Sequence, residues 1–290
     1  MYTCVPFKQV DVFTAAPYKG NPVAVVNLMD KDESEYSTEY LQSIANWTNL
    51  SETTFLLKPT KLNCDYKLRI FTPASELPFA GHPTVGSCWA FHEFTGKTGN
   101  SLTYQECGLG VVEITRTGET LLFKAAKADI EEISHAEVDA YEEVLNTKFL
   151  EPAKLLQVGP KWIVCLVKDA EICYNLEPDF QKMKEYNTKF NATGLIVAGK
   201  KQGEDAYEMR AFAPAEGVSE DPVCGSGALA LARCLQSVHN FQATYSFKIY
   251  QGGRLGRKGQ INAIIEHVDS GINYKVGGRA VTVVDGTIKF

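Results

Sequence analysis

The sequence lacks the marks of an exported or membrane-spanning protein. No apolar segment follows a basic start at the N-terminus, and no stretch approaches about 18 uncharged apolar residues, the length that a membrane-spanning helix requires. Secretion and membrane insertion are therefore not expected. The cytoplasm is the expected location.

Metal-binding cysteine patterns are also missing. The 8 cysteines form no Cys-x-x-Cys pair and have no histidine at zinc-finger spacing, so no metal site is expected. In a chain without an export signal the thiols should be reduced, and most should be small apolar core residues. Cys224 is the exception, because it lies inside a glycine-rich motif.

Neither sign of charge dominates. The 29 Lys and Arg residues and the 35 Asp and Glu residues give a formal net charge of −6, and they are interspersed along the chain. This pattern argues against a nucleic-acid-binding face and against a polybasic membrane patch. With 290 residues, of which 44% are hydrophobic, the chain suits two domains of ordinary size. We expect a globular protein whose partner is a small molecule, with no nucleic acid and no membrane.

One motif occurs twice. Residues 66–73 read Tyr-x-Leu-Arg-x-Phe-x-Pro, and residues 207–214 read Tyr-x-Met-Arg-x-Phe-x-Pro. Each copy is soon followed by a glycine-containing signature, Ala-Gly-His-Pro at 80–83 or Cys-Gly-Ser-Gly at 224–227. The repetition predicts two pseudo-equivalent halves that face each other.

The repeat extends upstream of these motifs. Residues 41–57 align with 181–197, and in this alignment Ala192 stands where the first half has Glu52. A duplicated scaffold that places a carboxylate in only one half is what a single site at the domain interface would look like.

Apolar spacing predicts the same order of elements in both halves. Helices are predicted at 37–47 and at 83–94, the second of them buried on all sides, and its partner in the other half is 225–238. Strands are predicted at 6–13, 22–26, 53–57 and 66–71, and residues 276–290 are predicted to form a hairpin. Helices surrounded by short strands indicate an α+β fold, in which each half wraps a curved, mostly antiparallel sheet or barrel around one central helix.

Both central helices begin directly after a signature. Their first backbone N–H groups, and the positive ends of their dipoles, should therefore point at whatever lies between the halves. In the first signature Gly81 lets a substrate approach the backbone, Pro83 suits the first helical turn, and His82 can donate or accept a hydrogen bond. A lone histidine in such a loop is more often a structural capping or buried hydrogen-bonding group.

The second signature combines three polar groups. Asp221, Cys224 and Ser226 place a carboxylate, a thiol and a hydroxyl in a glycine-rich turn that leads into a helix. This arrangement suits an anionic or polar substrate at a helix N-terminus. The alternative is that Asp221 is only a helix N-cap.

Together these motifs resemble the phenazine-biosynthesis isomerase-like proteins of the diaminopimelate epimerase superfamily. The resemblance covers essentially the whole chain, including the segments at 7–13, 20–25, 49–53, 71–73, 80–84, 221–226 and 277–278, and is strongest to fungal members. It implies two pseudo-symmetric domains, a terminal strand that crosses back to the first domain, and a homodimer. The boundary is expected within 126–151, where acidic residues precede the second copy of the motif, and the expected domains are 1–128 with 276–290, and 129–275.

The resemblance also implies roles for individual residues. Glu52 matches the family's catalytic acid and base, and His82 and Asp221 match residues that line and polarise the site. Asn21, Gly81, Gly225 and Ser226 match substrate-binding positions. The implied reaction is an allylic or keto–enol proton shift on a small carboxylated metabolite, without cofactor or metal.

Two other functions remain open. The epimerase branch of the superfamily uses two cysteines, one at each signature, whereas this chain has Cys224 at one signature and Ala80 at the other. A two-cysteine racemase is therefore disfavoured, and a packing role is the better interpretation of Cys224. The other alternative is a non-catalytic binding or protein-interaction member of the fold, against which the joint presence of Glu52, His82 and Asp221 argues.

One segment matches the pattern of a phosphate-binding loop only in part. Residues 194–201 nearly spell a phosphate-binding loop, but the middle of the segment is an apolar strand and Lys201 stands where such loops have a magnesium-binding hydroxyl. Nucleotide binding there is not expected.

Overall fold

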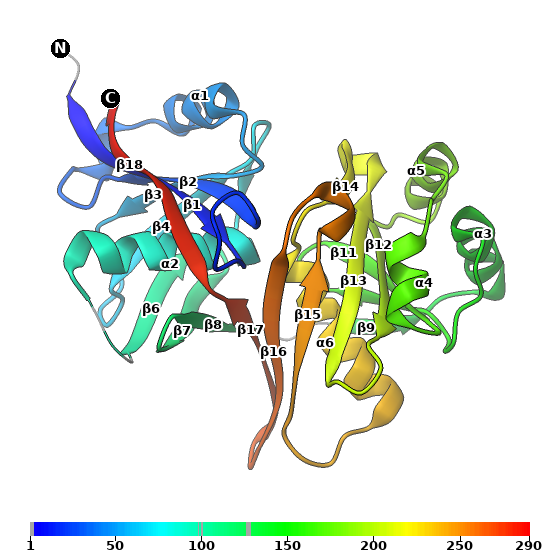
Figure 1. The fold of residues 1–290 in the computed structure, drawn as a ribbon. Helices are drawn as coiled ribbons and strands as arrows, with labels where there is room; N and C mark the ends of the chain where they lie inside the picture. Colours follow the sequence, from blue (N-terminus) through cyan, green and yellow to red (C-terminus); the bar gives the residue numbers. More distant parts are fainter. Residues whose placement is uncertain (1–2, 98, 100, 126–128) are drawn as a thin grey trace. The chain divides into compact units, whose positions relative to one another are not determined.

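The computed structural model describes residues 3–97, 99, 101–125 and 129–290. The chain forms two compact units: unit 1 contains Met1–Lys124 and Gly277–Phe290, and unit 2 contains Ala125–Val276 (Figure 1). The first residues of the expected boundary segment, 126–128, lie outside the described residues. Within the described part of the chain, no helix is both long enough and apolar enough to cross a membrane.

The described residues of unit 1 form a mixed sheet, the α-helices α1 and α2, and the 3-10 helix η1 (Glu33–Glu35) (Figure 1). Its strands are β1 (Cys4–Val12), β2 (Asn21–Asn27), β3 (Thr53–Leu57), β4 (Tyr66–Phe71), β5 (Glu76–Leu77), β6 (Ser101–Cys107), β7 (Gly110–Thr117), β8 (Thr120–Lys124) and β18 (Ala280–Lys289). Its helices are α1 (Thr38–Thr48) and α2 (Gly81–Thr95). The strands pair in the order β18-β1-β2-β3-β4-β6-β7-β8, with β5 beside β4; β2–β3 and β4–β6 are parallel and the other pairs are antiparallel.

Unit 2 repeats this arrangement with additional helices. Its strands are β9 (Asp129–Glu132), β10 (Lys154–Gln157), β11 (Lys161–Val167), β12 (Gly194–Lys200), β13 (Ala206–Ala213), β14 (Val218–Asp221), β15 (Tyr245–Gln251) and β16 (Gly259–Val268), followed by β17 (Gly271–Gly278). Its helices are α3 (His135–Leu145), α4 (Ala170–Asn175), α5 (Phe180–Lys189) and α6 (Gly225–His239). The pairing order is β9-β10-β11-β12-β13-β15-β16, with β14 beside β13; β11–β12 and β13–β15 are parallel and the other pairs antiparallel.

The duplication seen in the sequence is confirmed by this connectivity. In each unit a helix leads into each of the two parallel pairings, α1 and α2 in unit 1, and α4–α5 and α6 in unit 2. The α+β class and the predominance of antiparallel pairs are confirmed as well. The segment at 194–200 is strand β12, so the absence of a phosphate-binding loop there agrees with its apolar sequence.

Sheet register corrects one detail of the repeat. Thr53 pairs with Phe71, and Leu195 pairs with Phe212. Because the two phenylalanines occupy the same place in the duplicated motif, Glu52 is equivalent to Gly194, and the alignment of Glu52 with Ala192 was wrong by two residues. The alignment extended the repeat upstream at a constant spacing, and spacing along the chain does not determine the register of a strand. The conclusion that only the first copy carries a carboxylate is unchanged.

Each unit surrounds one central helix, as predicted. Helix α2 packs against strands β1, β2, β3, β8 and β18, and α6 packs against β10, β11, β12 and β16. Most residues of both helices are buried, on all sides of the helix axis. At Gly86 a Cβ would lie 2.4 Å from the Val23 side chain, so glycine there allows α2 to approach the sheet closely.

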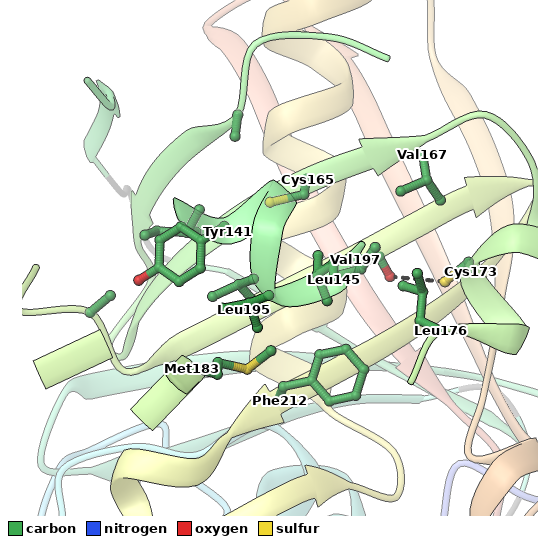
Figure 2. Close-up of a cluster of buried hydrophobic side chains, with 14 residues drawn as sticks. Tyr141, Leu145, Cys165, Val167, Cys173, Leu176, Met183, Leu195, Val197 and Phe212 are labelled. Atoms are coloured by element: carbon green, nitrogen blue, oxygen red, sulfur yellow. Dashed lines mark hydrogen bonds between the residues drawn. The ribbon is translucent and has the colours of Figure 1, made fainter. Parts of the chain in front are cut away.

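A second apolar core in unit 2 lies between its outer helices and its sheet. Figure 2 shows its members, among them Tyr141, Leu145, Cys165, Val167, Cys173, Leu176, Met183, Leu195, Val197 and Phe212. The thiol of Cys173 donates to the Val197 carbonyl at 3.3 Å, and burial raises the pKa of the Cys165 and Cys173 thiols. These cysteines therefore behave as small apolar core residues, which is the role expected for most of them.

The predicted hairpin at 276–290 is wrong. Residues 280–289 form the single strand β18, which pairs antiparallel with β1 from Cys4 opposite Lys289 to Val12 opposite Ala280. Asp285 and the following glycine suggested a turn, but Asp285 Oδ2 forms an ion pair with Lys8 Nζ at 2.9 Å. The backbone groups of β1 need a second partner strand besides β2, and that demand outweighs the local turn preference.

Candidate active site

Glu52 is held at a junction between a helix and a strand. Helix α1 ends at Asn49, which has a left-handed backbone (φ 55°), and β3 begins at Thr53. The backbone carbonyl of Glu52 accepts the N–H of Ala24 at 3.3 Å. The start of the sheet therefore fixes the backbone from which the carboxyl group projects.

The carboxyl group of Glu52 contacts the imidazole of His82. Glu52 Oε2 lies 3.2 Å from His82 Nε2, and the two side chains are 15% and 8% exposed. Burial raises the pKa of Glu52 to about 7, and a hydrogen bond from the Ser51 hydroxyl opposes this rise. A carboxyl group with a pKa near neutrality can both remove a proton and return it.

His82 is the second residue of α2, whose N-terminus has no side-chain cap. The N-cap residue Ala80 is extended and makes no capping hydrogen bond. The first N–H groups of any helix have no intrahelical acceptor, and the helix dipole adds positive potential at this end. Gly81 and His82 thus present a site suited to an anionic group beside the carboxyl of Glu52.

Asn21 belongs to the same group of residues. It is the buried first residue of β2, and its Oδ1 lies 3.5 Å from the hydroxyl of Ser51. The loop before it is held by Asp11, whose carboxylate accepts the N–H groups of Lys19 at 2.8 Å and of Gly20. The predicted residues Asn21, Glu52, Gly81 and His82 are therefore brought together within unit 1.

The other predicted residues lie in unit 2. Asp221 ends β14, and its Oδ1 accepts the N–H of Val223 at 2.9 Å. Gln251 clamps the turn that follows: its Nε2 donates to the Asp221 carbonyl at 2.8 Å, and its Oε1 accepts the N–H of Cys224 at 2.9 Å. Gln251, at the end of a distant strand, was not identified from the sequence, where no motif marks it.

Cys224, rather than Asp221, is the N-cap of α6. Its Sγ accepts the N–H of Gly227 at 3.3 Å. The interpretation of Asp221 as the helix N-cap is therefore wrong, because the helix starts three residues later in the chain. Gly225 and Ser226 form the first turn of α6, and Ser226 Oγ lies 3.5 Å from the Cys224 sulfur.

Ser226 has a partner that the sequence did not reveal. The indole Nε1 of Trp162, on β11, donates to Ser226 Oγ at 3.0 Å. Trp162 reads only as one more apolar residue of a buried strand, so no sequence signal sets it apart. As for metals, within the described ranges no cluster of three or more His, Cys, Asp or Glu side chains is arranged to hold an ion.

The chain is similar to known proteins over nearly its whole length. The family model for PhzC-PhzF, described as phenazine biosynthesis-like protein, matches residues 10–286. A Schizosaccharomyces pombe protein named Antisense-enhancing sequence 1 is 40% identical over 293 residues, which cover 97% of this chain and 97% of that protein. The trans-2,3-dihydro-3-hydroxyanthranilate isomerase of Pseudomonas chlororaphis is 31% identical over 285 residues, which cover 96% and 97% of the two chains.

A solved structure gives the same result for the fold. The phenazine biosynthesis protein of the PhzF family from Enterococcus faecalis superposes with a TM-score of 0.80 at 27% identity, over 99% of each chain. The resemblance stated from the sequence motifs, including the resemblance to a fungal protein, is thus confirmed by family profile, by relatives and by structure. The chain belongs to the PhzC-PhzF family of phenazine biosynthesis-like proteins.

Proposed function

We propose that this protein is a cofactor-independent isomerase that moves a proton between two carbons of a small carboxylated metabolite, with Glu52 as acid and base. The isomerase class follows from its family and from relatives named as isomerases. The acid–base role of Glu52 is supported by its contact with His82 and by the pKa of its carboxyl group, which is about 7.

The proposed reaction has two proton transfers. The ionised Glu52 removes a carbon-bound proton, and the electron pair of that C–H bond moves into the adjacent π system as a dienolate or enolate. The protonated Glu52 then delivers the proton to a second carbon on the same face of the substrate, where a new C–H bond forms. One double bond changes position, and neither an oxidant nor a reductant is needed.

His82 and the first turn of α2 supply electrostatic stabilisation in this proposal. Negative charge develops on the substrate when the carbon-bound proton leaves. Prearranged hydrogen-bond donors in a water-poor site stabilise such charge, and this is commonly the largest catalytic contribution. Asn21 and Gly81 would position the substrate next to these groups.

We further propose that Asp221, Gly225 and Ser226 serve the same active site. Support comes from the sequence: the two signatures occupy equivalent places in the repeat, yet only the first copy carries a carboxylate at the position of Glu52. A single substrate bound by both signatures accounts for this asymmetry. A homodimer and a cytoplasmic location remain predictions of the sequence.

The substrate class is suggested by the relatives. The Pseudomonas chlororaphis isomerase is named for trans-2,3-dihydro-3-hydroxyanthranilate, a cyclic amino acid with a carboxylate and an allylic system. This compound is the first substrate to test, followed by other small unsaturated carboxylates. The name of the 40% identical relative, Antisense-enhancing sequence 1, mentions no reaction, so a non-catalytic role stays the alternative.

Proton exchange in heavy water distinguishes catalysis from binding. The protein is incubated in deuterium oxide with each candidate, and deuterium at carbon is followed by mass spectrometry and NMR. Glu52→Gln should lose nearly all exchange. The matched control is Glu208→Gln, because Glu208 is 9% exposed, has a pKa raised to about 7 by burial, and lies outside the proposed site. Equal loss in both variants, or none in Glu52→Gln, rejects the assigned role of Glu52.

A further inference from the structure

Trp162 occupies the space of a missing side chain in unit 2. It stands opposite Gly194 in the parallel β11–β12 ladder. A Cβ at Gly194 would lie 2.8 Å from the indole Cζ3 of Trp162 and 2.0 Å from the backbone oxygen of Phe212. Glycine is therefore required at 194. Trp162 is 4% exposed, and its indole ring packs across this glycine.

This arrangement is the counterpart of the Glu52–His82 contact. By sheet register Gly194 is equivalent to Glu52, and Ser226 is equivalent to His82 because each is the second residue of its central helix. In unit 1 a carboxyl group contacts the helix residue at 3.2 Å, whereas in unit 2 an indole N–H contacts it at 3.0 Å. An acid–base group has thus been replaced by a permanent hydrogen-bond donor.

The replacement determines what Ser226 can do. An indole N–H can only donate, so Ser226 Oγ must accept from Trp162, and the hydroxyl proton must point elsewhere. The other neighbour, Cys224 Sγ at 3.5 Å, is a weak acceptor that already accepts the N–H of Gly227. A carboxylate oxygen is a much stronger acceptor for that proton.

We propose that Trp162 is a positioning residue, which holds the Ser226 hydroxyl as a hydrogen-bond donor for the carboxylate of the substrate. The inference rests on the proposed function for the assignment of Ser226 to substrate binding. It adds that the second signature selects an anionic carboxylate over an uncharged amide through a residue that does not itself touch the substrate.

The test uses two ligands that differ only in this group, anthranilate and 2-aminobenzamide. Their dissociation constants are measured by calorimetry or NMR titration with the full-length chain carrying Glu52→Gln, so that no turnover interferes. Trp162→Phe keeps an aromatic ring and removes the N–H. We expect it to weaken anthranilate binding about 3- to 10-fold and 2-aminobenzamide binding less than about 2-fold, since hydrogen bonds to charged groups are the stronger ones.

Ser226→Ala and a double variant separate positioning from packing. If Trp162 acts through the hydroxyl, Trp162→Phe should have no further effect on anthranilate binding once Ser226 is alanine. Trp89→Phe is the matched control, because it removes an indole N–H that donates to Glu93 in unit 1. Thermal denaturation of each variant checks that the fold is retained.

Three outcomes overturn the inference: equal binding of the two ligands by the parent protein, including no binding of either; equal weakening of both ligands by Trp162→Phe; or additive effects in the double variant. None of these depends on catalysis. The effect of Trp162→Phe on binding could require Ser226 while Glu52→Gln leaves proton exchange unchanged. That result would preserve this inference and reject only the proposed acid–base role.

Discussion

The carboxyl group of Glu52, just before strand β3, lies 3.2 Å from the imidazole of His82 in the first turn of helix α2. Both side chains are largely removed from water. Burial alone accounts for the raised pKa of Glu52, because the hydrogen bond from Ser51 acts in the opposite direction. The proposed acid–base role of Glu52 and the stability of the fold therefore depend on pH through the same group.

Removing the carboxyl group should abolish catalysis without unfolding the protein. General acid–base catalysis contributes about 10²- to 10⁴-fold, so Glu52→Gln should lower kcat by that factor once a substrate is found. Substrate affinity should change little, because the amide keeps the size of the side chain. Steady-state kinetics beside Glu208→Gln measures the effect; comparable rates in the two variants would contradict it.

The pH profile should report the buried carboxyl group. In the proposed mechanism the ionised form removes the proton, so kcat/KM should rise with pH and level off above the Glu52 pKa of about 7. His82→Leu should lower the plateau by about 10-fold or more, since it removes a donor to the developing charge. The midpoint should stay near its original position, because burial rather than His82 sets it. A midpoint near 4.5, the ordinary value of a glutamate, would show that Glu52 is not the group observed.

Stability should fall as pH rises in the wild-type protein more than in Glu52→Gln. Between the ordinary pKa of 4.5 and the folded-state value of about 7, the folded protein binds a proton that the unfolded chain has released. Raising the pH through this window lowers the free energy of unfolding by up to about 3 kcal/mol, and the contribution of Glu52 no longer changes at higher pH. Urea unfolding at pH 5 and pH 8 gives the difference between the two proteins. Identical pH dependence would mean that Glu52 is solvated.

Cys224 should prove structural. Its sulfur caps α6 by accepting the N–H of Gly227, so Cys224→Ala should cost about 1 kcal/mol of folding stability, and Cys224→Ser should recover most of this. Proton exchange should be reduced far less than in Glu52→Gln. Chemical denaturation and the heavy-water assay are run on the same preparations. Loss of exchange in Cys224→Ala with full exchange in Glu52→Gln would revive a thiol mechanism.

Gly194→Ala should destabilise unit 2 by about 2 kcal/mol or more. The added Cβ would lie 2.0 Å from the Phe212 backbone oxygen, and a paired strand cannot easily move away. Trimming the nearby ring with Trp162→Ala should therefore not restore stability in the double variant. Guanidinium unfolding measures both proteins, and full rescue would show that the ring, not the backbone, is the obstacle.

Much of the fold could be predicted from the sequence because local and global preferences agree. The strands at 53–57 and 66–71 have the predicted bounds, and the two apolar helices after the signatures are the central helices α2 and α6. Alternation, apolar runs and a repeated motif were sufficient for these elements.

The remaining features depend on pairing across the fold, which spacing along the chain does not reveal. The equivalence of Glu52 with Gly194 required strand register, and the role of Cys224 required the start of α6 to be known to the residue. Trp162 and Gln251 come from strands far in sequence from the residues that they hold. Glu52 and His82 were identifiable because each lies in a motif of its own.

The pairing of β18 with β1 has a consequence for how the protein is made. Strand β1 is synthesised before unit 2 and β18 after it, yet Thr3 and Phe290 exchange backbone hydrogen bonds of 2.8 and 2.7 Å. During synthesis one edge of β1 therefore stays unpaired until β18 has been made. An unpaired strand edge favours association with other chains. Unit 1 begins first and is completed last, so the two units cannot finish folding in the order of their sequence.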